Sequence, residues 1–120
     1  MKPDSDILER IFHEPSRMAI MSALCAAEDG LTFTELKDSC GLTDGNLSRH
    51  LKTLEEFGAV RTEKAFVALK PRTTVRLTTA GLARFREYLD ALEDVLEKAR
   101  KALPTARKTA TLFAARPVRA

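Results

Sequence analysis

Between positions 43 and 52 the chain carries seven small or hydrogen-bonding residues whose types and spacing could do chemistry. Two of them have planar groups with several donors or acceptors. The amide of Asn46 can bond N6 and N7 of adenine, and the guanidinium of Arg49 can bond O6 and N7 of guanine. This chemistry is the reading of base edges, with a neighbouring lysine available to a phosphate. The candidate contact residues are Thr43, Asp44, Gly45, Asn46, Ser48, Arg49 and Lys52.

A helix must present these side chains. Apolar residues recur three and four positions apart from Leu47 to Phe57, which predicts a helix with one buried stripe, and Thr43 can cap its start. The candidate residues then share the opposite face. Gly45 and Asn46 do not favour helix formation. Their presence is explained if this face must approach another surface closely, because small side chains permit that approach. The alternative is an ordinary solvent-exposed helix surface.

A shorter helix is predicted immediately before it. Thr32 and Glu35 have the spacing of a capping box, and Cys40–Gly41 ends the pattern. Two helices joined by a turn of about four residues form a helix-turn-helix unit. The second helix of such a unit suits the DNA major groove, which is roughly 12 Å wide. Its first backbone amides, together with Thr43 and Ser48, can hold a phosphate.

A basic β-hairpin is predicted next. Residues 60–66 and 74–78 alternate in polarity like strands, and the segment from Ala68 to Arg72 is interpreted as the turn between them. Lys70 and Arg72 would then lie at the tip and reach the flanking DNA backbone or the minor groove. Phosphate contact or simple solvation is expected for Lys52, Lys64 and Arg76.

Positive charge is concentrated over these two elements. Residues 49–76 hold seven bases and three acids, a local charge of +4, whereas residues 1–103 together carry −1. Clustered positive charge on a nearly neutral body is typical of a protein that binds a polyanion, although a charged run also occurs as a solvated face.

The longest regular pattern runs from Ala80 to Leu103. Its apolar residues are spaced alternately three and four apart, as in a heptad seam, which predicts a dimerisation helix roughly 35 Å long. The seam could close as a parallel or an antiparallel pair, or pack on a first helix predicted over residues 6–13. A second helix is expected after Pro15, and Leu31–Thr34 would need a strand partner elsewhere. The predicted dimerisation residues are Leu82, Phe85, Leu89, Leu92, Leu96, Ala99 and Leu103.

The sequence does not show the residue patterns that metal binding or catalysis requires. Among His13, His50, Cys25 and Cys40 no two have a metal-ligand spacing. His50 is expected to orient its helix through a hydrogen bond, and both thiols are interpreted as small buried hydrophobes, with a redox role for Cys40 as the alternative. No phosphate loop, nucleophile elbow or catalytic carboxylate pair is visible. We therefore expect no enzyme activity, metal or cofactor.

Neither a membrane span nor a signal peptide is visible. No apolar run approaches the roughly 18 residues that a span needs, and Met1–Asp6 is polar. We therefore expect a cytoplasmic protein without a membrane partner.

Five segments of the chain form one pattern, in the order Pro15–Met21, Phe33–Leu36, Leu42–Glu55, Gly58–Val60 and Val75–Gly81. Together they resemble a known family, the winged helix-turn-helix regulators of the ArsR and MarR type, over residues 7–90. The resemblance implies a homodimeric regulator that binds double-stranded DNA, usually as a repressor. It also implies that Arg72 is in the place of the wing arginine and that the helix after Gly81 is the dimerisation helix.

One feature of metal-sensing ArsR members is absent. Their Cys-Val-Cys metal box has no counterpart in Glu35–Cys40, which argues against metal sensing at that place, and the sequence identifies no small-molecule effector. The fold class expected is mainly α with a small β-hairpin wing. Residues 1–103 would form the winged helix domain, including the dimerisation helix at 80–103. Residues 104–120 would form a basic tail, interpreted as disordered, with a minor-groove arm as the alternative.

Two functions follow from these patterns. The first is a sequence-specific DNA-binding transcriptional regulator, a homodimeric repressor. The second is a winged-helix protein–protein interaction module that does not bind DNA. The composition of the helix face at 43–52 favours the first.

Overall fold

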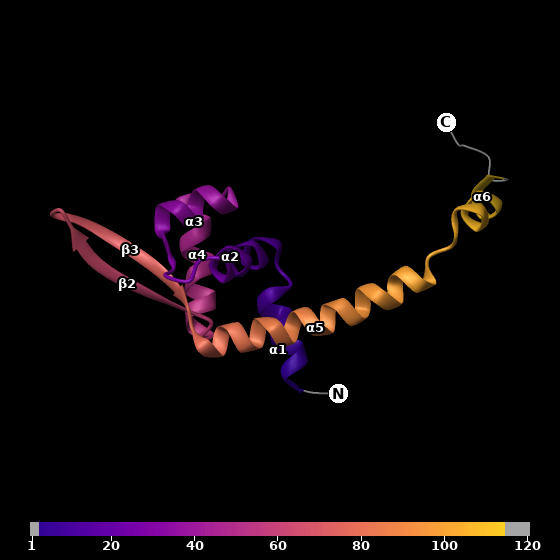
Figure 1. The fold of residues 1–120 in the computed structure, drawn as a ribbon, viewed down its shortest axis with the longest axis horizontal. Helices are drawn as coiled ribbons and strands as arrows, with labels where there is room; N and C mark the ends of the chain where they lie inside the picture. Colours follow the sequence, from indigo (N-terminus) through magenta and orange to yellow (C-terminus); the bar gives the residue numbers. More distant parts are fainter. Residues whose placement is uncertain (1–2, 115–120) are drawn as a thin grey trace. The chain divides into compact units, whose positions relative to one another are not determined.

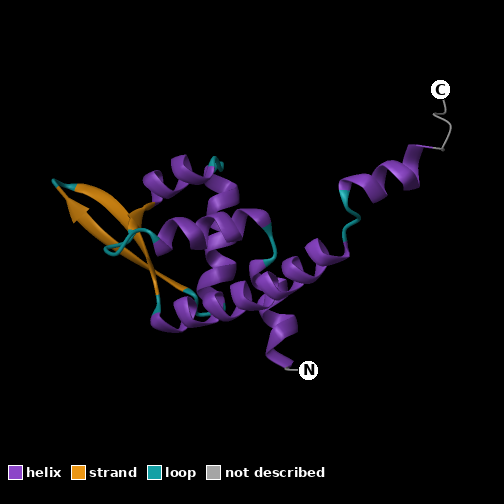
Figure 2. Cartoon of the chain, turned by 45° about the vertical axis from the view of Figure 1, so that its right-hand side comes forward, coloured by secondary structure: helices purple, strands orange, loops and turns teal. Residues whose placement is uncertain are grey.

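The computed structural model describes residues 3–114, which form six helices and a small antiparallel sheet (Figures 1 and 2). Two compact units divide the chain after Leu89. The mainly α fold with a β-hairpin wing is the predicted class. The elements are α1 (Pro3–Phe12), α2 (Pro15–Cys25), β1 (Leu31–Thr32), α3 (Phe33–Cys40), α4 (Asp44–Glu56), β2 (Val60–Val67), β3 (Lys70–Leu77), α5 (Thr79–Ala102) and α6 (Ala106–Ala114).

The start of the predicted helix-turn-helix unit is fixed by local hydrogen bonds. The Thr32 hydroxyl accepts from the Glu35 amide at 3.1 Å, and the Glu35 carboxylate accepts from the Thr32 amide at 2.9 Å. The hydrogen bond from the Thr32 backbone, followed by that from its side chain, lowers the pKa of the Glu35 carboxylate. Gly41, at φ 64°, ends α3 in the left-handed conformation that glycine adopts without strain. The predicted capping box and helix end are both confirmed.

The sheet has the strand order β1-β3-β2. Strand β1 is only two residues long and pairs Leu31 with Val75, so the partner that this segment was expected to need is β3. The predicted turn at 68–72 was wrong, because Val67 pairs with Lys70 and only Ala68 and Leu69 lie between the strands. Lys70 and Arg72 therefore belong to β3, behind the tip.

Pro71 explains why the sequence suggested a longer turn. Proline is normally excluded from a central strand because it cannot donate to a strand neighbour. Here β1 pairs with β3 only at Thr74 and Val75, so one edge of β3 has no strand beside it at Pro71. The proline is tolerated there, opposite Phe66.

An aromatic cluster centred on Phe12 joins the N-terminal helix to α4 and α5. The fully buried ring of Phe12 lies 5.7 Å from that of Phe57, 5.3 Å from Phe85 and 5.8 Å from Tyr88. Phe85 was predicted to meet a second copy of the chain, but it is 2% exposed and packs on α1. The start of the heptad seam therefore serves the core of the chain itself. This is the alternative in which the long helix packs on the first helix.

The predicted disordered tail was wrong for residues 106–114, which form α6. Alanine, lysine, arginine and leucine have high helix propensity, and they supply most of this segment. The remainder of the predicted tail, residues 115–120, lies outside the described residues. No helix within residues 3–114 is both long and apolar enough to cross a bilayer.

The base of the wing and the start of α5 are joined through Thr78 and Gly81. The Thr78 hydroxyl donates to the Gly58 carbonyl at 2.6 Å and accepts from the Gly81 amide at 2.8 Å. Gly81 is buried so closely against the Ala59 backbone that a Cβ atom added to it would lie 2.0 Å from the Ala59 oxygen. A residue larger than glycine does not fit at this joint.

We predict that Gly81→Ala destabilises the fold by about 1–3 kcal/mol, because this overpacking outweighs the usual gain of alanine over glycine in a helix. Gly45→Ala is the matched control, since a Cβ there meets nothing within 4 Å. It should stabilise the fold by about 0.5–1 kcal/mol. Urea unfolding of both variants checks this, and equal stabilisation by the two would contradict the close approach.

Candidate nucleic-acid interface

The buried stripe of α4 fixes which residues face outward. Leu47, His50, Leu51 and Leu54 are buried. At about 100° per residue, Gly45, Arg49 and Lys52 then point directly away from the core, with Asn46 and Ser48 on the two flanks. The structure brings all seven residues predicted at 43–52 to one exposed surface, the α4 face, composed of Thr43, Asp44, Gly45, Asn46, Ser48, Arg49 and Lys52.

Two hydrogen bonds organise the start of the α4 face. The Thr43 hydroxyl accepts from the Asn46 amide at 3.2 Å and caps the helix, as predicted. The side-chain oxygen of Asn46 accepts from Nη2 of Arg49, also at 3.2 Å. The two groups that suit base edges therefore lie side by side in an exposed position, where each restricts the rotamers of the other.

The acidic member of the face is paired within the chain. Lys37 on α3 lies 3.0 Å from the Asp44 carboxylate, which raises the pKa of the lysine. Asp44 also sits in the first turn of α4, where a negative charge stabilises the helix dipole. The pairing offsets a charge that would otherwise repel a phosphate at the helix start.

Arg17 anchors the buried side of α4, and sequence reasoning missed it. Its guanidinium donates to the carbonyls of Ile11 at 2.6 Å and Arg10 at 3.2 Å, at the end of α1. The third partner is Nδ1 of His50, at 3.2 Å. His50 thus orients α4 through a hydrogen bond, as expected, but no local pattern could reveal a partner 33 positions away in the sequence.

The wing supplies a second group of cations. Lys70 and Arg72 are exposed and two positions apart on β3, so their side chains leave the same face of the hairpin. Arg72 lies close enough to α3 to contribute to the lowered pKa of Glu35. Arg76 was expected to contact phosphate or solvent. It is instead bound to the Glu63 carboxylate at 3.1 Å and the Asp29 carbonyl at 2.5 Å.

The cysteines lie apart from these surfaces. The interpretation of both thiols as buried hydrophobes was wrong for Cys25, which is exposed, and Cys40 is only half-buried. Desolvation raises the pKa of both thiols, which lowers the fraction of reactive thiolate. Among the residues that the structure describes, no three His, Cys, Asp or Glu side chains form a possible metal site.

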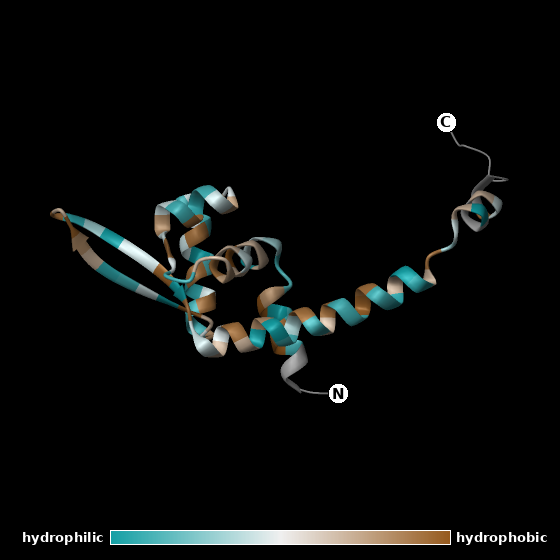
Figure 3. Cartoon of the chain, viewed as in Figure 1, coloured by the Kyte–Doolittle hydropathy of each residue, from teal (hydrophilic) through white to brown (hydrophobic). Residues whose placement is uncertain are grey.

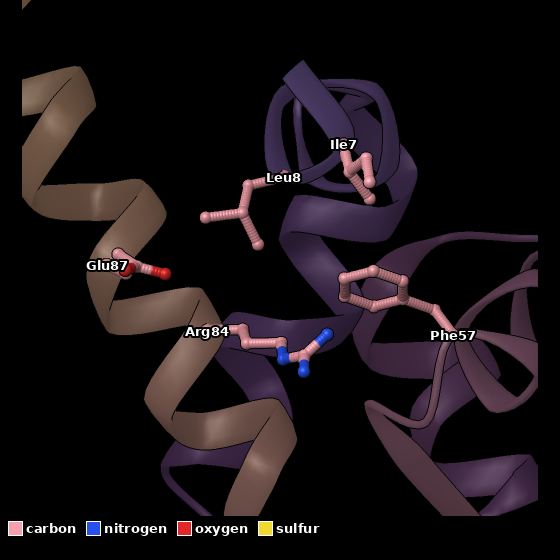
Figure 4. Close-up of a pocket in the computed structure, with 5 residues that line it drawn as sticks. All are labelled: Ile7, Leu8, Phe57, Arg84 and Glu87. Carbon is pink, nitrogen blue, oxygen red and sulfur yellow. The ribbon is translucent and has the colours of Figure 1, made fainter. Parts of the chain in front are cut away.

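A small hollow of about 230 Å³ separates α1 from the first turns of α5 (Figure 4). Ile7, Leu8 and Phe57 give it an apolar side, and Arg84 and Glu87 project from α5 on the other. The Arg84 guanidinium lies 5.3 Å from the centre of the Phe57 ring, a distance at which a cation is attracted to the ring face. The hollow therefore has both apolar and charged walls.

A family model described as a winged helix DNA-binding domain matches residues 16–96. The chain belongs to this family. This winged-helix chain is 38% identical over 80 residues to an uncharacterised protein of Methanocaldococcus jannaschii, a match that covers 67% of this chain and 86% of that protein. The resemblance predicted from the sequence is thereby confirmed for the winged helix.

Solved structures agree with this assignment. A transcriptional regulator homologue from Pyrococcus horikoshii is 32% identical and has a TM-score of 0.70, over 75% of this chain and 88% of that one. The MepR–DNA complex of S. aureus is 19% identical and has a TM-score of 0.60, over 95% of this chain and 82% of that one. The helix-turn-helix unit of α3 and α4 and the hairpin of β2 and β3 both lie within the matched residues 16–96.

We predict that stability falls as the pH drops below about 6.5. Burial lowers the pKa of His50, and the charges of Arg17 and Arg49 act in the same direction against that of Glu14. The unfolded chain therefore binds the proton more readily, so stability is fully present above the ordinary histidine pKa and is lost as the pH falls through it. Protonation would also turn the Nδ1 acceptor of His50 into a donor facing Arg17.

Thermal melts between pH 7.5 and 5.5 test this prediction. The wild type should lose stability over that range, and His50→Gln should lose markedly less. His13→Gln is the second histidine variant to melt, because the His13 ring is hydrogen-bonded to the Tyr88 hydroxyl, and comparing the two variants separates the contributions of the two histidines. A pH dependence that survives in His50→Gln would assign it to another group.

Proposed function

We propose that this winged-helix protein is a sequence-specific transcriptional regulator of double-stranded DNA, acting as a homodimeric repressor. The α4 face carries the proposal, because it combines small exposed residues, which permit close approach, with Asn46 and Arg49, whose side chains suit base edges. The basic wing beside it supplies phosphate contacts. The P. horikoshii regulator homologue and the DNA complex of MepR support this function.

The dimer is proposed from the exposed part of α5. Apart from Phe85, the predicted seam residues are exposed or half-buried, with Leu82 40%, Leu96 49% and Leu103 67% exposed. A row of exposed leucines is costly in water, and a second copy of the helix would cover it. The proposed dimerisation residues are therefore Leu82, Leu89, Leu92, Leu96, Ala99 and Leu103.

A two-fold dimer sets the form of the operator. Two α4 helices in successive major grooves require an inverted repeat with half-site centres about 34–36 Å apart. If each subunit neutralises three or four phosphates, log K should fall against log salt with a slope of roughly −5 to −7. The second candidate function is a protein–protein interaction module, which would use the same exposed leucines to bind its partner. It predicts neither an inverted-repeat operator nor a salt dependence of DNA binding.

We predict that Arg49→Ala relaxes base preference and costs about 1–3 kcal/mol on the selected site. Lys52→Ala should instead weaken all sequences alike and flatten the salt slope by about 1 per subunit, because it removes a phosphate contact. The measurement is selection from a random duplex pool, followed by salt-dependent binding of each variant. An Arg49→Ala protein that keeps its base preference would contradict base reading by α4.

We also predict that Leu96→Glu yields a folded monomer, because a charge at the seam cannot be buried against its own copy. Sedimentation should show the mass of one chain, while circular dichroism keeps the helical signal. Lys98→Glu is the matched control, since it adds the same side chain nearly opposite the seam on α5, and it should stay dimeric. A wild-type protein that sediments as a monomer would contradict the proposed homodimer.

A further inference from the structure

The tip of the wing is apolar, although its flanks are basic. Phe66 is 78% exposed, Val67 42% and Leu69 95%, and Figure 3 shows the end of the hairpin in the hydrophobic colour. These side chains lie too far out to join the core of the chain. A turn that serves only to reverse the chain has no need of three large apolar groups.

The two residues of the turn, one of which is Leu69, have strained backbone conformations. Ala68 has φ 52° and Leu69 has φ 66°. A two-residue hairpin turn with both φ values positive is normally built from Asn-Gly or Asp-Gly. A leucine in this conformation costs roughly 1–2 kcal/mol. Such an outlier points to a function for the side chain itself.

The strands of the hairpin remain paired up to the turn that carries the tip. Val67 pairs with Lys70, and Phe66 pairs with Pro71, so Leu69 projects from a fully paired ladder. Phe66 and Pro71 share one face of the hairpin, which places an aromatic ring and a proline ring together directly behind the turn. Leu69, Phe66 and Pro71 together form an apolar wedge at the end of the paired strands.

The charges around the wedge indicate its occupant. Residues 64–73 contain Lys64, Lys70 and Arg72 and no acidic residue, and all three bases are exposed. The register puts Lys64 on one face of the hairpin and Lys70 and Arg72 on the other. Cations on both faces of an apolar tip are complementary to a groove lined by phosphates with stacked bases at its floor. This arrangement matches the construction of proteins that insert Phe, Leu or Pro between base steps from the minor groove.

We propose that the wing tip wedges Leu69, backed by Phe66, between base pairs in the minor groove and kinks the DNA beside the sequence that α4 reads. This inference rests on the proposed DNA-binding function. Lys64, Lys70 and Arg72 hold the flanking phosphates. Because pyrimidine–purine steps unstack most easily, the wedge selects TA or CA steps at positions where no side chain reads a base edge.

The test uses the full chain with its selected operator and a series of duplexes, each with one flanking adenine replaced by 2-aminopurine, whose fluorescence rises on unstacking. Wild type should raise the fluorescence several-fold at one step per half-site. End-to-end energy transfer should report a kink in the 20–90° range of known wedge proteins.

The double variant Ala68→Asn with Leu69→Gly removes the wedge and gives the turn its favoured residues. It should melt at or above the wild-type temperature, lose the fluorescence rise and the kink, and bind the operator about tenfold more weakly. Leu69→Met, which keeps an apolar side chain, should retain both signals. A double variant that still unstacks and bends the duplex would overturn the wedge.

The two proposals fail in different ways. Salt-dependent binding that is lost in Arg49→Ala, with no unstacking by the wild type, would overturn the wedge and leave the regulator function standing. Absence of any selective duplex binding would overturn both. A change in assembly mass caused by the double variant, with bending unaltered, would assign the tip to contact between copies and overturn the wedge.

Discussion

The burial of Phe12 is the interaction on which the arrangement of α1, α4 and α5 depends. Its ring touches Phe57 at the end of α4 and Phe85 and Tyr88 on α5. A side chain of this size contributes roughly 1.5–3 kcal/mol when fully buried. Because its neighbours come from two distant parts of the chain, the cluster holds the end of α4 and the first turns of α5 against α1. Arg17 completes this support by binding the end of α1 to His50.

Local chemistry made much of the fold predictable. The capping box at Thr32 and Glu35, the cap at Thr43 and the glycine at position 41 each act within a few residues, so their signals are complete in the sequence. The α4 face was predictable for the same reason, because the buried leucines determine where every other side chain of the helix points.

The errors arose where distant contacts decide the outcome. Pro71 looked like a turn residue because the sequence does not show that the pairing of β1 with β3 stops at Thr74. Phe85 fitted the heptad seam by its spacing. Spacing alone cannot distinguish an apolar residue that packs against a second chain from one that packs against Phe12 of the same chain. Arg17 had no signal at all, since its value lies in acceptors on α1 and α4 that the fold brings together.

The position of the joint at Thr78 and Gly81, at the base of the wing, means that a small rotation at this joint moves the wing tip by a larger distance. Eight residues of strand at about 3.3 Å each place the tip roughly 26 Å from this joint. A tilt of about 5° there displaces the tip by roughly 2 Å. Since the same hydroxyl also accepts from the Gly81 amide at the start of α5, a reorientation of the first turn of that helix that tilts the hairpin moves its tip much farther than its base.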